Sequence, residues 1–272
     1  MTMTIDETLA PQTVAPTASR PFPLVRHSLT LAKRSVVKIR RTPEQLLDVT
    51  LQPMIFVLLF VYIFGGAIAG NTHDYLEFVL PAIMVQTLAF SSVAIGVNLN
   101  TDISKGVFDR FRSLPIPRPA PLVGAVLGDI VRYCVSVIVL MSFGYLLGFR
   151  IQTNIFSATL ACLIVIGFSL CLSWISVFVG MVFRSPGAVQ GIGFLLIFPL
   201  TFGSNLFVPT DTLPNWLQAW VHINPVTYLV DTTRALMLGG EVLSPLLKTV
   251  ASALVILAIF APLAVRAYRR KA

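Results

Sequence analysis

The stretch TDISKGVFDRFRSLP, residues 101–115, separates two long apolar runs of the chain. Hydrocarbon cannot solvate its charged side chains, so we predict that the stretch lies in water between two membrane spans. These side chains are Asp102, Lys105, Asp109, Arg110 and Arg112. Read as a helix, the stretch is amphipathic. Its apolar face consists of Ile103, Val107, Phe111 and Leu114, with Phe108 beside them.

A small apolar face on a helix outside the membrane needs a cover. One interpretation is a cytoplasmic protein partner that covers residues 101–115. The alternative is a loop that lies on the lipid headgroups, and the periodicity alone favours neither.

The composition of the whole chain indicates an integral membrane protein. Of its 272 residues, 56% are hydrophobic and 12% are charged, and the mean hydropathy is +0.82. A soluble domain carries about 25% charged residues. In a membrane protein the net charge of +8 reports topology rather than nucleic-acid binding. Cys134, Cys162 and Cys171 all lie in apolar runs without metal-ligand spacing, so we expect free, buried thiols.

The N-terminal region divides into two segments. Residues 1–23 are rich in Thr, Ala and Pro, and we predict a disordered cytoplasmic tail. Residues 24–41 combine an apolar stripe with six Lys and Arg side chains on the other faces, a pattern typical of a helix in the membrane interface. The alternative for this segment is a soluble helix packed on another subunit.

We predict that residues 42–272 form one all-α membrane domain with six transmembrane helices. Each apolar run has roughly the 20 residues needed to cross a bilayer, and Pro53 is expected to kink the first. The expected spans are residues 46–69, 76–98, 122–149, 155–183, 187–207 and 246–265.

The basic residues predict the orientation of these spans. Most Lys and Arg side chains precede the first span, follow the second and fourth, or lie at the C-terminal end. The opposite side holds only Arg150, Arg234 and Lys248. By the positive-inside rule, both termini and the loop at residues 102–118 are cytoplasmic.

The sequence gives little support for an enzyme. It contains no Gly-x-x-x-x-Gly-Lys-Ser/Thr pattern that could hold ATP phosphates, and no metal-ligand cluster. Asp129 and Arg132, three residues apart inside the third span, are expected to pair with each other or with the cytoplasmic loop. No acidic residue falls at mid-membrane, which argues against a proton- or sodium-driven carrier.

Residues 208–244 contain signals for an outer structure. Trp216 and Trp220 share a helix face, and tryptophan prefers the headgroup level. We predict a short helix that ends at Asn224-Pro225 and a second one tied down by Asp231 and Arg234. Such a re-entrant pair could form an extracellular gate; the alternative is a folded surface loop.

Two sets of motifs resemble one known family. Asp102-Ile-x-x-Gly106-x-x-Asp109-Arg110-x-x-x-Leu114-Pro115 with Arg118 is similar to the cytoplasmic loop of type-2 ABC exporter permeases, in particular the daunorubicin-resistance type. The segment FGSNLFVP at residues 202–209, Leu213-Pro214, Trp216, Asn224-Pro225, Asp231 and Arg234 resemble the fifth span and outer re-entrant motif of that family.

The resemblance implies a multi-pass permease of the bacterial plasma membrane. It implies a permease dimer, homo- or heteromeric, that binds two separate ATPase subunits, which carry the ATP and Mg²⁺. This chain then needs no cofactor and binds no nucleic acid. The coupling helix that docks into the ATPase would contain Asp102, Gly106, Phe108, Asp109, Arg110, Phe111 and Leu114.

The resemblance also implies that the second and fifth spans form the conduit across the dimer axis. Candidate conduit residues are Gln86, Phe90, Phe202, Asn205 and Phe207. Candidate outer-gate residues are Trp216, Trp220, Asn224, Pro225, Asp231 and Arg234.

The function that these motifs imply is ATP-driven export of an amphiphilic hydrophobic molecule such as a drug, lipid or polyketide. The first alternative is a polysaccharide or glycolipid exporter permease of the same fold. The second, from another class, is a non-catalytic channel or scaffold. A channel needs polar rings around a pore, and the polar residues of the spans are too few to indicate one.

Overall fold

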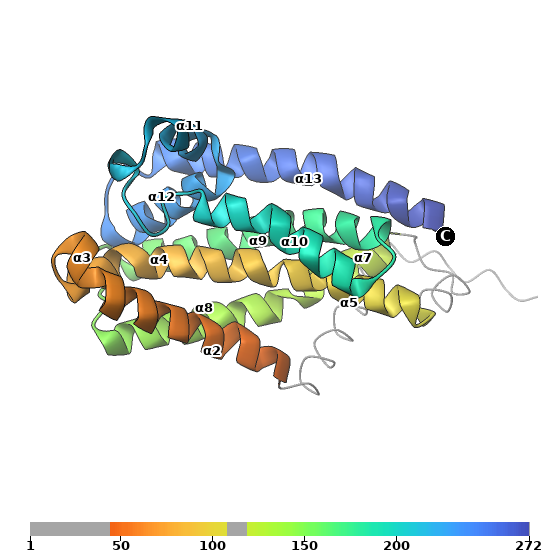
Figure 1. Cartoon of the computed structure of the whole chain (residues 1–272), viewed down its shortest axis with the longest axis horizontal. Helices are drawn as coiled ribbons and strands as arrows, with labels where there is room; N and C mark the ends of the chain where they lie inside the picture. The colour runs from red at the N-terminus through yellow and green to blue at the C-terminus, as the bar shows by residue number, and fades with distance from the viewer. Residues whose placement is uncertain (1–43, 108–118, 272) are drawn as a thin grey trace, which may run out of the picture.

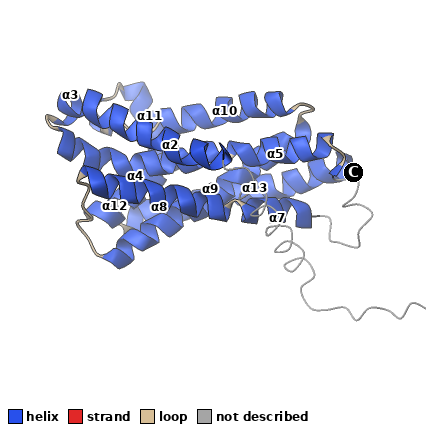
Figure 2. Ribbon diagram, turned by 90° about the horizontal axis from the view of Figure 1, so that it is seen from below, coloured by secondary structure: helices blue, strands red, loops and turns tan. Residues whose placement is uncertain are grey.

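The computed structural model describes residues 44–107 and 119–271. Every regular element in these two ranges is a helix, which confirms the all-α prediction. The long helices run along one common axis of the molecule (Figure 1), and the view from below shows the same arrangement (Figure 2). The predicted tail and interfacial helix, residues 1–41, lie outside the described residues.

Within the described residues, five helices are long and apolar enough to cross a membrane. They are Thr50–Ala69, Thr72–Ser104, Ala120–Leu147, Ile155–Val182 and Leu243–Arg270. A further apolar helix, α10 (Pro186–Phe202), has 17 residues and is shorter than the others.

The first membrane helix changes its geometry along its length. It consists of α2 (Glu44–Leu59), the π-helix η1 (Phe60–Phe64) and α3 (Gly65–Ala69). The helix continues through Pro53, and its departure from α-helical geometry lies seven residues later, at η1. It ends at Gly70, whose φ of 77° suits glycine.

The second membrane helix is longer than the sequence predicted. It consists of α4 (Thr72–Ser91) and α5 (Val93–Ser104), and it therefore ends six residues beyond residue 98. Asp102 and Ile103 belong to this helix rather than to a separate one, because Gly106, with φ of 69°, turns the chain after it. Ile103 packs against the cluster that contains Leu99. The turn at Lys105 and Gly106 separates it from Val107, so these two residues do not lie on one continuous helix as predicted.

The third and fourth membrane helices follow the prediction closely. α7 (Ala120–Gly128) and α8 (Ile130–Leu147) meet at Asp129, and α9 spans Ile155–Val182. The Asn154 side chain begins α9 by accepting a hydrogen bond from the Ser157 backbone N–H.

α10 is shorter than predicted at its C-terminal end. The Ser185 side chain caps its start and Pro186 is its first residue. The helix ends at Phe202 rather than at residue 207, because the Nδ2 group of Asn224 donates to the carbonyls of Leu200 and Gly203 and satisfies its last turn. Asn205 and Phe207 therefore lie in an irregular segment after the helix.

Two short helices follow, as the sequence predicted. After the 3₁₀ turn η2 (Thr210–Thr212) come α11 (Asn215–Ile223) and α12 (Pro225–Leu238). They lie at the end of the molecule opposite the C-terminus (Figure 1). The last helix, α13 (Leu243–Lys271), returns along the whole bundle.

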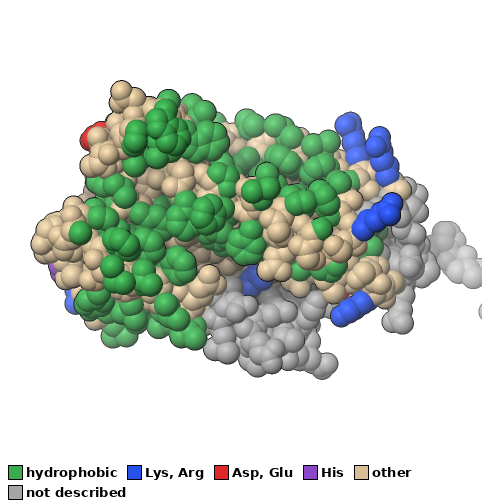
Figure 3. Space-filling model, viewed as in Figure 1, with side chains coloured by type: hydrophobic (Ala, Val, Ile, Leu, Met, Phe, Trp, Pro, Cys, Tyr) green, Lys and Arg blue, Asp and Glu red, His purple; other side chains and the backbone are tan. Residues whose placement is uncertain are grey.

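The core is built around α4, which is buried over most of its length, whereas α13 is largely exposed. α5 and α9 approach closely at Gly96 and Gly180, where a methyl group on Gly180 would lie 2.6 Å from the Gly96 carbonyl oxygen. Gly144 on α8 packs against Leu80, whereas Gly191 on α10 has no neighbour within 4 Å of such a methyl group. Apolar side chains cover much of the flank of the bundle (Figure 3).

Candidate functional site

A cavity of about 640 Å³ lies among α2, α4, α5 and α10. One part of its lining is aromatic and contains Phe56, Phe90, Phe194, Phe198 and Phe202. Another part is polar and contains Gln52, Gln86, Thr87, Ser91, Asn98, Arg132 and Gln190. The cavity lining therefore combines aromatic rings with hydrogen-bonding groups.

Three of the five predicted conduit residues line this cavity, namely Gln86, Phe90 and Phe202. Asn205 and Phe207 are not part of the lining, since both follow the end of α10. Phe194 and Phe198 also line the cavity and were not among the predicted conduit residues. Their signal was the spacing of four residues that leads from Phe194 through Phe198 to Phe202 on one helix face.

The aromatic side chains of the cavity contact one another. The ring centroids of Phe198 and Phe202 lie 4.3 Å apart, and those of Phe90 and Phe194 lie 5.4 Å apart. Phe90 also meets Phe202 edge to face at 6.4 Å. These contacts join α4 to α10 through an aromatic wall.

A second aromatic group adjoins this wall at the α3 end of the molecule. Phe60, on the π-helical turn, stacks on Phe207 with a centroid distance of 4.2 Å. Phe207 in turn lies 5.4 Å from Phe202, which lines the cavity. Phe207 thus contacts the cavity wall from outside the cavity.

Arg234 holds the irregular segment that carries Phe207. Its guanidinium donates to the carbonyls of Phe78, Asn205 and Leu206, at 3.0, 3.0 and 2.8 Å. The same group lies 3.6 Å from the centroid of the Phe78 ring. One side chain of α12 therefore fixes the backbone after α10 against α4.

Asp231 and Arg234 hold α12 through partners on other segments of the chain. Both lie in the described part of the chain, and no ion pair joins them there. Instead, Asp231 accepts a hydrogen bond of 2.6 Å from Nδ2 of Asn205. Burial raises the pKa of Asp231, while the Asn205 bond and the charge of Arg234 lower it in part. Burial lowers the pKa of Arg234 to about 10, so it remains charged at neutral pH.

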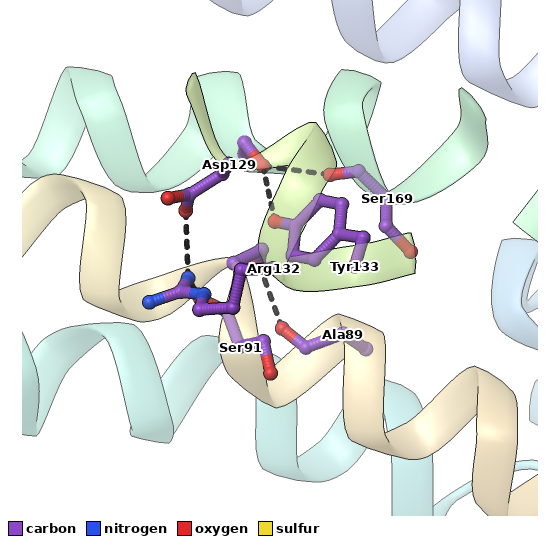
Figure 4. Close-up of polar contacts among 8 residues, drawn as sticks. Ala89, Ser91, Asp129, Arg132, Tyr133 and Ser169 are labelled. Atoms are coloured by element: carbon purple, nitrogen blue, oxygen red, sulfur yellow. Dashed lines mark hydrogen bonds and ion pairs between the residues drawn. The ribbon is translucent and has the colours of Figure 1, made fainter. Parts of the chain in front are cut away.

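Asp129 and Arg132 pair with each other, which confirms one of the two predicted alternatives. Nη2 of Arg132 lies 2.6 Å from the Asp129 carboxylate and 2.6 Å from the Ser91 carbonyl oxygen. Figure 4 shows the Arg132 side chain between these two groups. Arg132 lines the cavity, whereas Asp129 does not. The next residue, Tyr133, hydrogen-bonds Ser173 at 2.9 Å and ties α8 to α9.

The candidate outer-gate residues divide into buried and exposed members. Asn224 is buried and, besides ending α10, accepts from the backbone N–H of Val226 to start α12. Trp216 is 73% exposed on α11, and Trp220 packs partly against Gly203. Pro225 is the first residue of α12.

The family of this chain follows from a comparison with known protein families. The model of the ABC-2 type transporter matches residues 26–238, and this range includes the cavity, the loop after α5 and the outer helices. The chain belongs to the ABC-2 type transporter family.

Curated relatives of this ABC-2 permease include drug-resistance permeases. The chain is 42% identical over 264 residues to a daunorubicin resistance ABC transporter permease protein of Streptomyces coeruleorubidus, covering 96% of this chain and 93% of the relative. A probable doxorubicin resistance permease of Mycobacterium tuberculosis is 24% identical, covering 82% and 81%. A putative transport permease of Cyanophora paradoxa is 28% identical, covering 79% and 75%.

Most of the predicted coupling segment of the permease lies outside the described residues. This applies to Phe108, Asp109, Arg110, Phe111 and Leu114. Of the remaining two, Asp102 is partly buried near the end of α5, and Gly106 makes the turn that follows.

The permease shows no metal-binding group of His, Cys, Asp or Glu in the two ranges that the structure describes. Cys134, Cys162 and Cys171 are free thiols of intermediate exposure. The sequence predicted buried thiols, whereas none of the three is fully buried in the structure.

Proposed function

We propose that this permease exports an amphiphilic, largely apolar molecule such as a drug, a lipid or a polyketide, driven by ATP hydrolysed on a separate ATPase chain. The observation that carries this proposal is the cavity among α2, α4, α5 and α10, with its aromatic wall and its polar groups. Aromatic and apolar walls with a few polar groups are typical of small-molecule sites. The drug-resistance names of two relatives agree with this substrate class.

The conduit is formed by the second and fifth spans, α4–α5 and α10. In this proposal α10, completed by the irregular segment up to residue 208, is the fifth of six membrane crossings. A second permease subunit covers the open side of the cavity. Exposed apolar side chains on α10 support this arrangement, since Leu195 is 72% exposed and Phe198 lines the cavity while it is more than half exposed.

The ATPase binds at the end of the bundle where α5, α9 and α13 have their C-terminal ends. Support comes from the basic side chains near that end, which include Lys105, Arg184, Arg266, Arg269 and Arg270. Blue side chains gather there in the space-filling view (Figure 3). By the positive-inside rule this end is cytoplasmic, together with both termini. Two ATPase copies, holding ATP and Mg²⁺, would serve a permease dimer.

α11 and α12 form the outer gate. Trp216 on α11 lies free for the headgroup level, and the contacts of Arg234 and Asn224 join this region to the end of α10. A movement of α12 would therefore shift Phe207 and, through it, Phe202 in the cavity wall.

Efflux from cells or vesicles that contain the permease and its ATPase tests the proposal. The substrate is daunorubicin, whose fluorescence reports its movement. We expect ATP-dependent transport, and we expect Phe90→Ala and Phe198→Ala to reduce it at least several-fold. Phe156→Ala is the matched control, because Phe156 is 76% exposed on α9 and lies away from the cavity lining. Transport that survives both cavity changes at the level of the control contradicts the conduit assignment.

A further test addresses coupling. Changing both Phe108 and Phe111 to Ala should lower copurification of the ATPase while the permease still inserts in the membrane. Each buried phenylalanine contributes about 1.5–3 kcal/mol of apolar contact. Unchanged ATPase recovery would remove these two residues from the docking surface without affecting the cavity.

A further inference from the structure

Arg132 reaches the cavity from α8, whereas most of the lining comes from α2, α4, α5 and α10. It is the one charged side chain among the described lining residues. Only 4% of its surface is exposed, so its charge lies inside the bundle rather than in open solvent. A buried charge is costly unless it is paired and its hydrogen bonds are made.

The hydrogen bonds of Arg132 leave part of its guanidinium unused. A guanidinium has five N–H donors. Both bonds to described residues, to Asp129 and to the Ser91 carbonyl, use Nη2. Nε is buried and has no partner in the described part of the chain. Nη1 donates to no described residue and is not one of the buried unpaired atoms, so it is the donor that an acceptor in the cavity can meet.

Of the two paired charges, only the positive one faces the cavity. The Asp129 carboxylate neutralises Arg132 but is not part of the lining, so the cavity meets the donor rather than the acceptor of the pair. The aromatic wall of Phe90, Phe194 and Phe198 belongs to the same cavity. A molecule bound here meets hydrogen-bond donors at one part of its surface and aromatic rings at another.

We propose that Arg132 is the polar anchor of the ligand site and selects amphiphiles that carry a carboxylate or carbonyl oxygen beside an aromatic body. The oxygen accepts from the guanidinium, and the aromatic body packs on the phenylalanines. An amphiphile with an amine at the same position has no acceptor for these donors and places like charges together. The inference rests on the proposed function, since it assigns the chemistry of the substrate to the same cavity.

Binding of two matched fluorescent probes tests this inference. The probes are pyrenebutyrate and pyrenebutylamine, which share the aromatic body and differ in the polar end. The full-length permease in lipid nanodiscs is titrated with each, and empty nanodiscs correct for partition into lipid. We expect wild type to bind pyrenebutyrate about tenfold more tightly than pyrenebutylamine, the size expected for one charge-assisted hydrogen bond.

Two variants of the pair separate the anchor from a structural role. Arg132→Gln alone leaves the buried Asp129 carboxylate without the charge of Arg132 and can fail to fold. The double variant Asp129→Asn/Arg132→Gln removes both charges together and avoids this problem. We expect it to bind both probes with similar affinity while its thermal stability stays near that of wild type. If the folded double variant keeps the wild-type preference for pyrenebutyrate, the anchor assignment is wrong.

The Phe198→Ala variant distinguishes this inference from the proposed function. If the cavity binds the aromatic body, Phe198→Ala weakens both probes alike and preserves their ratio. If Phe198→Ala weakens binding of both probes but the double variant keeps the wild-type ratio of their affinities, only the Arg132 anchor is overturned. If neither Phe198→Ala nor the double variant changes the affinity for either probe, the assignment of the cavity as the ligand site is wrong.

Discussion

Nδ2 of Asn205 lies 2.6 Å from Oδ1 of Asp231, and this hydrogen bond joins the irregular segment after α10 to α12. The two residues are 26 positions apart in the chain. Asn205 is buried, and its other amide atom, Oδ1, has no partner among the described residues. Asn205 therefore serves the packing of the outer segment, and the cavity is lined by other residues.

The first prediction concerns Asp231. Asp231→Ala removes the acceptor of the Asn205 amide and should cost about 1–3 kcal/mol of stability, because a buried donor is left unpaired. Asp231→Asn keeps an acceptor oxygen at the same place and should be tolerated. Thermal unfolding of both purified variants measures the difference, and equal losses would contradict the hydrogen-bond role.

The pH dependence of the same residue gives the second prediction. Burial raises the pKa of Asp231 in the folded state, so folding favours the protonated carboxyl. The corresponding stability is fully present below the unfolded pKa and is lost as pH rises through the folded pKa. Relative to wild type, Asp231→Asn should therefore gain stability as the pH is raised from about 4 to 7. A difference that stays constant over this range would argue against a raised pKa.

The third prediction concerns the guanidinium of Arg234 and its three carbonyl partners. Arg234→Lys keeps the charge but cannot reach three carbonyls in three directions with the planar geometry of a guanidinium. We expect a loss of about 2–4 kcal/mol and weaker transport, since the segment that carries Phe207 is released. The matched control is Arg150→Lys, at an exposed arginine whose two carbonyl bonds go to its own turn. Similar melting temperatures for the two variants would show that the Arg234 guanidinium does not stabilise the segment after α10.

The fourth prediction concerns the contact of α5 with α9. A methyl group on Gly180 would lie 2.6 Å from the Gly96 carbonyl oxygen, which is backbone and cannot move alone. Gly180→Ala should destabilise the permease by about 1–3 kcal/mol through overpacking. Gly191→Ala, with no neighbour within 4 Å, should be neutral or stabilising because alanine favours the helix. Detergent-solubilised yield and melting temperature report both.

The fifth prediction concerns orientation. In a background without the three native cysteines, a cysteine in place of the exposed His73 should react with an impermeant thiol reagent in intact cells. One in place of the exposed Lys105 should react only after permeabilisation. His73 is preferable to Asn71, whose side chain caps α4 through the Asp74 N–H. Labelling of Lys105→Cys in intact cells would show that the topology is the reverse of the one predicted, and it would contradict binding of the ATPase at this end of the bundle.

Local signals in the sequence predicted most helices with good accuracy. The long apolar runs predicted α9 and the body of the other membrane helices, and Asn224-Pro225 marked the end of the first short helix, which the structure confirms at Ile223. These signals act within a few residues, since hydropathy and end-capping need no partner from elsewhere in the chain. The same is true of the Asp129–Arg132 pair, which is closed within one helical turn.

The ends of helices that depend on distant partners could not be read from the sequence in this way. The sequence placed residues 203–207 on the fifth span because they continue an apolar run. In the structure, Asn224 ends α10 at Phe202 by binding its last carbonyls from 24 and 21 positions away. Similarly, apolar content gave no sign that the second span extends to Ser104.

Composition and apolar runs were enough to predict an all-helical membrane protein, and two motif regions were enough to indicate the ABC-2 permease family. The sequence did not show that Arg132 faces the cavity, that Asn205 pairs with Asp231, or that Arg234 binds a carbonyl 156 positions away on Phe78. These contacts come from the packing of several helices, which supplies each side chain with its partners. Spacing along one helix predicts which residues share a face, but it does not predict what that face meets.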